Sequence, residues 1–80
     1  MLPLALLNRG ELAEIVKLES LKAGGELHKE MTRAGALGLR EGKRVEILQA
    51  RKSGPYLVKV DETRIAIGKD LASQILTKKL

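Results

Sequence analysis

YLVKVDETRIAI, residues 56–67, decides the fold of this chain. Tyr56 to Val60 and Thr63 to Ile67 are rich in residues that favour strands, and only Asp61 and Glu62 separate the two runs. Two such runs joined by two residues predict a tight β-hairpin. Asp61 tolerates the left-handed conformation that these turns require, whereas Glu62 stands where Gly is usual, so the turn type stays open.

Strand patterns continue on the N-terminal side of this hairpin. Apolar and charged residues alternate in residues 43–50 (KRVEILQA), which predicts a strand with one buried face. Residues 53–55 (SGP) then form a turn. A first strand is predicted over residues 11–18 (ELAEIVKL), where the apolar residues change parity after Ile15. A β-bulge or a strong bend explains that change of face.

A helix is predicted between these two strands. Leu27, Met31 and Ala34 recur at helical spacing with charged residues on the other side, as in an amphipathic helix of about three turns. Gly38 marks the helix end because it can adopt the left-handed conformation there. Leu39 is then placed to fold back onto the last turn near Ala34.

The remaining segment predicts a helical turn and a last strand. Asp70 can cap a short helical turn over residues 71–73, and residues 74–77 are predicted to be extended. We therefore expect a mainly β fold, a small barrel of about five strands with one inserted helix. Closure of the barrel would leave no exposed strand edge, and residues 1–80 would form one domain.

The composition is that of a small soluble domain in a reducing compartment. Of the 80 residues, 44% are hydrophobic and 31% are charged, which argues against disorder. The absence of Cys excludes a disulfide framework and thiolate metal sites, and indicates the cytoplasm. The apolar run from Leu2 to Leu7 is broken by Pro3 and is too short for a signal peptide or a membrane span.

The net charge of +5 raises the possibility of nucleic-acid binding. Acidic residues lie close to basic ones along most of the chain, and only Lys78 and Lys79 form an uncompensated pair. Tyr56 is the only aromatic residue, whereas base stacking usually needs several. We do not expect a nucleic-acid partner, but a small basic barrel that binds nucleic acid, like some ribosomal or transcription-factor domains, is the alternative interpretation.

No group of residues predicts catalysis. His28 is the only histidine and lacks the second His or Cys that a transition-metal site needs. The Asp61-Glu62 pair fits a solvated turn better than a cation site, and Gly24-Gly25 lacks the Lys-Ser or Lys-Thr of a phosphate loop. We expect no catalytic residues, no cofactor and no metal ligands, and therefore no enzyme.

Four stretches share their order and spacing with one known family. Leu4, Leu7 and Gly10 match its opening pattern, and LGLREG at residues 37–42 matches the segment in which a helix ends at Gly-Leu. SGPYLVKV and ETRIAIGKDLASQI match its central turn and its closing segment. On these motifs the chain resembles, over nearly its whole length, the FeoA family of small cytoplasmic accessory proteins in bacterial ferrous-iron transport.

This resemblance implies a fold, a partner and a location. The fold would be a small Src-homology-3-like barrel with a helix inserted after the first strand. The partner would be a membrane ferrous-iron transporter of the FeoB type, whose GTPase domain lies in the cytoplasm and whose transport the chain would modulate. The chain would then work at the inner face of the membrane without inserting, and iron would be handled by the partner.

Such an adaptor can influence its partner only by binding the partner's different states with different affinities. We expect contact through the helix and the loop after it, with Met31, Leu39, Arg40 and Tyr56 as partner-binding residues. Met suits adaptable contacts and Arg suits interface pairing. Self-association stays open, because Leu2, Leu4 and Leu80 add apolar groups to a small core.

Overall fold

The computed structural model describes residues 1–18, 26–51 and 53–80, without the side chains of residues 26–28. The expectations for Gly24 and Gly25, and for the side chains of Leu27 and His28, lie outside the described residues.

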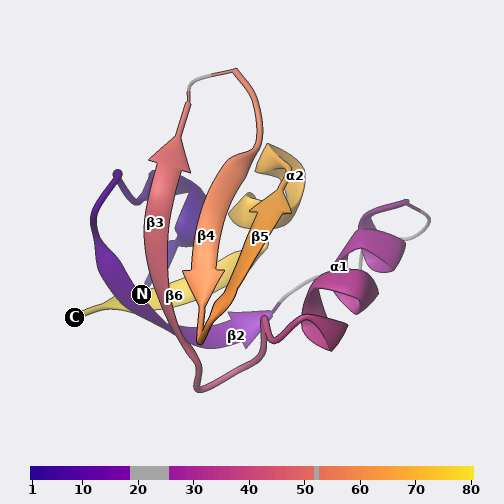
Figure 1. The fold of residues 1–80 in the computed structure, drawn as a ribbon, viewed down its shortest axis with the longest axis horizontal. Coiled ribbons are helices and arrows are strands. Elements are labelled where there is room, and N and C mark those ends of the chain that lie inside the picture. Colours follow the sequence, from indigo (N-terminus) through magenta and orange to yellow (C-terminus); the bar gives the residue numbers. More distant parts are fainter. Residues whose placement is uncertain (19–25, 52) are drawn as a thin grey trace.

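Six strands and three helical segments make up the described chain (Figure 1). In order they are β1 (Leu2–Pro3), η1 (Leu4–Leu6), β2 (Leu12–Leu18), α1 (Glu26–Ala36), β3 (Arg44–Ala50), β4 (Tyr56–Val60), β5 (Thr63–Ile67), α2 (Lys69–Ser73) and β6 (Ile75–Lys79). The strands form one antiparallel sheet in the order β1-β6-β2-β3-β4-β5. The predicted mainly β fold with one inserted helix is confirmed.

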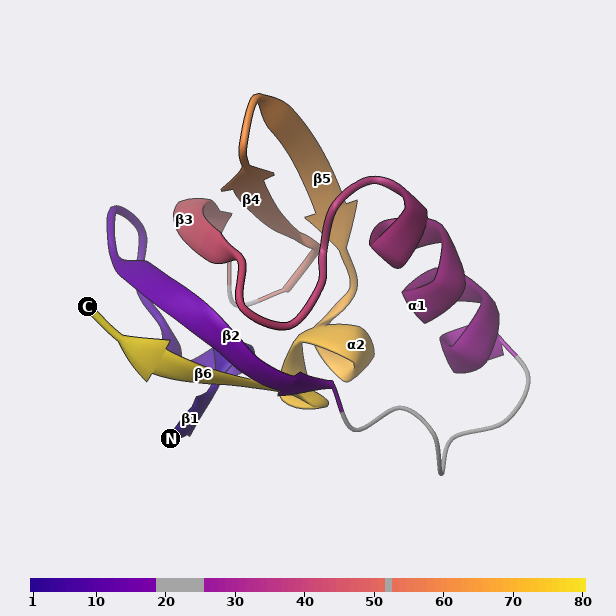
Figure 2. The same cartoon turned by 90° about the horizontal axis from the view of Figure 1, so that it is seen from below.

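The sheet differs from the expectation in two respects. It has a sixth strand, β1, which pairs with β6 and accepts a hydrogen bond at the Leu2 carbonyl from Thr77 Oγ1 at 2.8 Å. The sheet curls as in a barrel but is not closed, because no ladder joins the edge strands β1 and β5 within the described residues (Figure 2). The predicted closure is therefore wrong, and β5 keeps a free edge.

The predicted hairpin is confirmed. Val60 pairs with Thr63 across the turn, and Asp61 adopts the left-handed conformation with φ 56°. Every second side chain of β4 is buried, as are Ile65 and Ile67 of β5, and Val58 pairs directly with Ile65. Alternation places these side chains on one face of the hairpin, where they contribute to the core.

The predicted bulge in β2 is also confirmed. The register between β2 and β6 shifts between Ile15 and Lys17, at the change of parity in the sequence. A second shift lies in β3 between Ile47 and Gln49. Because bulges increase the local twist, these two strands can bend and pair on both sides.

The end of α1 has the geometry of a Schellman motif. Gly38 has φ 117°, its N–H donates to the Gly35 carbonyl at 3.1 Å, and the Leu39 N–H donates to the Ala34 carbonyl at 3.0 Å. These bonds satisfy carbonyls that the helix leaves free. Leu39 is thereby turned into the core, where it is fully buried.

The predicted cap of α2 is wrong. Gly68 is the N-cap of α2, in extended conformation, and no side chain makes a capping hydrogen bond there. Asp70 lies in the first turn instead, where a negative charge still interacts favourably with the helix dipole. The sequence favoured Asp70 because Asp is a stronger N-cap than Gly, but the end of β5 fixes where the helix starts.

The core lies inside the curled sheet, with η1, α1 and α2 packed along it. The buried apolar residues come from all of these elements: Leu4, Leu7, Ala13, Ile15, Met31, Ala34, Leu39, Val45, Ile47, Tyr56, Val58, Val60, Ile65, Ile67, Leu71, Ala72 and Ile75. Leu4 is fully buried and offers nothing to self-association, whereas Leu2 and Leu80 are exposed. No helix in the described parts of the chain is long and apolar enough to cross a membrane.

Candidate functional site

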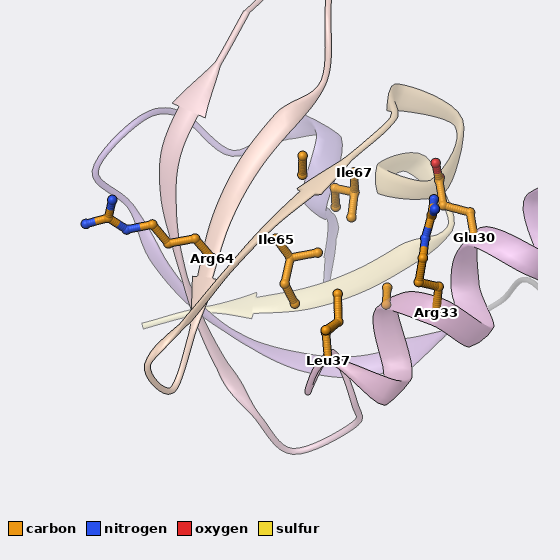
Figure 3. Close-up of a pocket in the computed structure, with 8 residues that line it drawn as sticks. Glu30, Arg33, Leu37, Arg64, Ile65 and Ile67 are labelled. Atoms are coloured by element: carbon orange, nitrogen blue, oxygen red, sulfur yellow. The ribbon is translucent and has the colours of Figure 1, made fainter.

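The first candidate site is a groove between α1 and the free edge of β5. Figure 3 shows its labelled residues, with α1 on one side and β5 on the other. Its volume is about 110 Å³. We define this α1–β5 groove by the residues that line it: Glu30, Arg33, Ala34, Leu37, Arg64, Ile65, Ala66 and Ile67.

Two apolar side chains face each other across the groove. Leu37, just after the last turn of α1, and Ile65 of β5 point toward one another in Figure 3. Ile65 is buried, whereas Leu37 is 47% exposed. A large aliphatic side chain beside a pocket in this way offers a partner an apolar contact, although single exposed leucines are common on protein surfaces.

Charged residues of α1 border one end of the groove. Glu30 and Arg33 are three positions apart, so they are neighbours on the helix surface. The Glu30 carboxylate lies close to Gly68, just after β5. A Cβ added to Gly68 would lie 3.6 Å from Glu30 Oε2. The Arg64 side chain extends away from the groove (Figure 3).

The β5 edge adds backbone groups to the groove. In a two-residue hairpin the residues beside the turn form a hydrogen-bonded pair, so Thr63, Ile65 and Ile67 bond to β4. The N–H and C=O groups of Arg64 and Ala66 then point to the free edge. No hydrogen bond to these groups is found in the described residues. Such an edge can pair with an extended segment of another protein.

The four predicted contact residues do not form one surface. Leu39 is fully buried, Met31 is 9% exposed and Tyr56 is 7% exposed, so all three lie in the core. Arg40 is exposed and folds back over α1, with its Nε donating to the Gly35 carbonyl at 3.0 Å. Of the four, Arg40 alone is exposed to solvent.

Leu37 is the groove residue that the sequence reasoning missed. It lies outside the buried stripe of Met31 and Ala34, on the side of the helix that carries Glu30 and Arg33. An aliphatic residue on a charged helix face was the available signal. The pattern of a helix end at Gly38 favours Leu39 instead.

Tyr56 lines a second depression on another part of the surface, which we call the Tyr56 hollow. Its hydroxyl donates to the Ala5 carbonyl at 2.6 Å and joins β4 to the N-terminal segment. The hollow has a volume of about 410 Å³. Its lining includes Ala5, Leu6, Asn8, Arg51, Tyr56 and Lys69.

Titratable groups do not gather at either depression in a way that suggests catalysis. In the described residues no three His, Cys, Asp or Glu side chains come together as metal ligands would. Among the described residues, the Glu11 carboxyl has a lowered pKa, because it accepts hydrogen bonds from Lys79 and from the Asn8 N–H. This ion pair also shows that Lys79, expected to be uncompensated, has a carboxylate partner.

Comparison with known proteins gives one family. The family model of the FeoA domain matches residues 2–79. No curated protein sequence matches the chain.

Solved structures of the same family have the same fold. One is an iron uptake regulatory protein, FeoA, at 26% identity and a TM-score of 0.80, with 99% of this chain and 96% of that chain covered. Iron(II) transport protein A from Clostridium thermocellum is 28% identical, with a TM-score of 0.78 over 99% of this chain and 46% of that one.

A third similar structure is the FeoA of Stenotrophomonas maltophilia in complex with zinc. It is described as an SH3 domain protein and a candidate ferrous-iron-transport activating factor. It is 22% identical, with a TM-score of 0.76 over 98% of this chain and 91% of that chain. At this identity the similarity shows the fold, which is the SH3-like arrangement expected from the sequence.

Proposed function

The chain belongs to the FeoA family, and on that premise we propose that it is a non-enzymatic accessory protein of bacterial ferrous-iron uptake. In this proposal it docks on the cytoplasmic GTPase-containing part of a FeoB-type membrane transporter and modulates transport. It works in the cytoplasm, at the inner face of the membrane, through that partner.

The observation that carries the docking proposal is the α1–β5 groove. An exposed Leu37 lies there beside a strand edge whose Arg64 and Ala66 backbone groups have no partner in the described residues. An apolar side chain supplies buried area on association, and a free edge supplies directional hydrogen bonds. Arg33 and Arg40 lie nearby and suit pairing with carboxylates of a partner.

Modulation of transport follows from differential binding. A binding module shifts a partner's equilibrium only by as much as its affinities for the two partner states differ. A GTPase domain has nucleotide-dependent states, so the affinity of the chain for the GTP-bound and GDP-bound forms should differ.

A protein partner also fits the surface better than a nucleic acid does. Tyr56 as a whole residue is 7% exposed, so it offers no platform on which a base could stack. Two basic side chains are neutralised by acidic partners: Lys43 pairs with Asp61 at 3.2 Å, and Lys79 pairs with Glu11.

The test is a binding titration with matched leucine variants. Leu37→Asp places a charge in the groove, and Leu80→Asp makes the same change at the exposed C-terminal residue. With the purified cytoplasmic domain of the transporter immobilised, Leu37→Asp should weaken binding by about tenfold or more, or about 1.4 kcal/mol. Leu80→Asp should bind like the parent, and an equal loss in both variants would remove the groove from the proposal.

A further inference from the structure

The Tyr56 hollow differs from the α1–β5 groove in its charge. Arg51, just after β3, and Lys69, at the start of α2, both contribute to its lining, and no Asp or Glu of the described residues does. Both cations are exposed, and in the described residues neither makes an ion pair. The hollow therefore carries a local positive charge that no described carboxylate in its lining offsets.

The floor of the hollow is apolar. Ala5 and Ala50 are partly buried against the core, and Leu6 is 64% exposed at the border. An aliphatic side chain of a ligand could cover Leu6 and remove its surface from water, at about 25 cal/mol per Å² of apolar area. Cations next to an apolar floor match a ligand that carries carboxylates next to aliphatic groups.

The hollow is held in shape before any ligand arrives. The hydrogen bond from Tyr56 to the Ala5 carbonyl fixes the N-terminal segment against β4, 51 positions away in sequence. Leu4 and Leu7, on either side of this segment, are buried in the core. A preformed site loses less conformational entropy on binding, so weak individual contacts contribute more to affinity.

We propose that the Tyr56 hollow binds a short extended segment of a partner protein in which acidic and aliphatic residues lie two positions apart, on the same face of the segment. In an extended segment, side chains two positions apart point to the same face, so a carboxylate and an aliphatic group spaced in this way can reach the cations and Leu6 together. The site is separate from the α1–β5 groove. It does not depend on the proposed transporter partner.

A peptide is favoured over a nucleic acid because the hollow lacks a stacking surface. Phosphates alone would satisfy Arg51 and Lys69 but would leave the apolar floor uncovered. The aliphatic groups of a peptide cover that floor and its carboxylates reach the cations.

The experiment uses the full chain, labelled with ¹⁵N, and three probes. The first is a capped octapeptide in which leucine and aspartate take turns at every second position with serine between them, the second has asparagine in place of each aspartate, and the third is single-stranded oligothymidine. The first peptide should shift the amide signals of Leu6, Asn8, Arg51 and Lys69 in a saturable way. The asparagine peptide should bind about tenfold more weakly.

Charge-reversal variants test the two cations. Arg51→Glu with Lys69→Glu should abolish the peptide shifts, whereas Arg64→Glu with Lys78→Glu, equal in net charge and also exposed, should change the affinity by less than about twofold. All four sites are on the surface, so both variants should keep the dispersed spectrum of the parent.

Four results would overturn the proposal. They are an absence of shifts, equal binding of the asparagine peptide, shifts confined to the α1–β5 groove, and tighter binding of oligothymidine than of the acidic peptide at the same salt concentration. The last result would assign the hollow to nucleic acid. None of these results bears on binding to the transporter, which uses the other surface.

Discussion

Leu37→Ala and Leu39→Ala separate recognition from packing at the end of α1. Leu39 is fully buried, and truncation of a buried Leu to Ala costs about 2–5 kcal/mol through lost burial and the cavity that remains. A chain of 80 residues has about 4–12 kcal/mol of stability, at about 0.05–0.15 kcal/mol per residue. Leu39→Ala therefore removes a large share of it.

Leu37→Ala should cost far less. Leu37 is 47% exposed, so the truncation loses roughly half of the burial energy of a leucine, about 1 kcal/mol or less. The two variants make the same chemical change two positions apart, on either side of Gly38. Each is therefore the control for the other.

Urea unfolding followed by far-ultraviolet circular dichroism measures both variants, since the chain has no Trp. With a slope near 1 kcal/mol/M, Leu39→Ala should lower the midpoint by about 2 M or more, and Leu37→Ala by about 1 M or less. At concentrations where both are folded, Leu37→Ala alone should weaken binding to the transporter domain. Two results would refute this assignment of the two leucines. One is a Leu39→Ala midpoint equal to that of the parent, and the other is a Leu37→Ala midpoint lower than that of Leu39→Ala.

Three further predictions concern single contacts. Gly38→Ala should lower the free energy of unfolding by about 1–2 kcal/mol, because the residue has φ 117°. Steric overlap adds little, since the new Cβ would meet Val60 Cγ1 at an ordinary 3.7 Å. An unchanged thermal midpoint would contradict this. Tyr56→Phe removes the donor to the Ala5 carbonyl and should lower the free energy of unfolding in urea by about 1 kcal/mol. An unchanged free energy of unfolding would mean that this bond does not stabilise the chain in solution. Because hydrogen bonds lower the pKa of Glu11, its stabilisation is full above the ordinary value of 4.5 and is lost as the pH falls through the folded value. The stability difference between the parent and Glu11→Gln should therefore shrink below pH 4.5, and a constant difference would exclude this contribution.

The parts of the fold that the sequence predicts well are set by neighbours in the chain. The turn at Asp61 and the helix end at Gly38 both depend on backbone conformations that few residue types adopt. The bulge after Ile15 was visible as a change of parity. By contrast, β1 contains two residues, too few for any periodicity, and it exists because β6 offers an edge.

The candidate site was harder to predict, because it depends on contacts between distant segments. Tyr56 was expected beside the helix, but its hydroxyl bonds to Ala5 and places it in a separate hollow. The roles of Leu37 and Leu39 depend on which way the chain turns at Gly38, and only the structure shows that Leu39 enters the core. The family resemblance supplied a partner, whereas the surface that meets it required three-dimensional placement.

Amide hydrogen exchange of the chain with and without the transporter's cytoplasmic domain tests the central claim most directly. The Arg64 and Ala66 amides, which point to the free edge of β5, should exchange fast in the free chain. The account predicts that they and the amide of Leu37 become protected in the complex. Unchanged exchange at these positions in a complex that demonstrably forms, with protection elsewhere, would contradict docking through the α1–β5 groove.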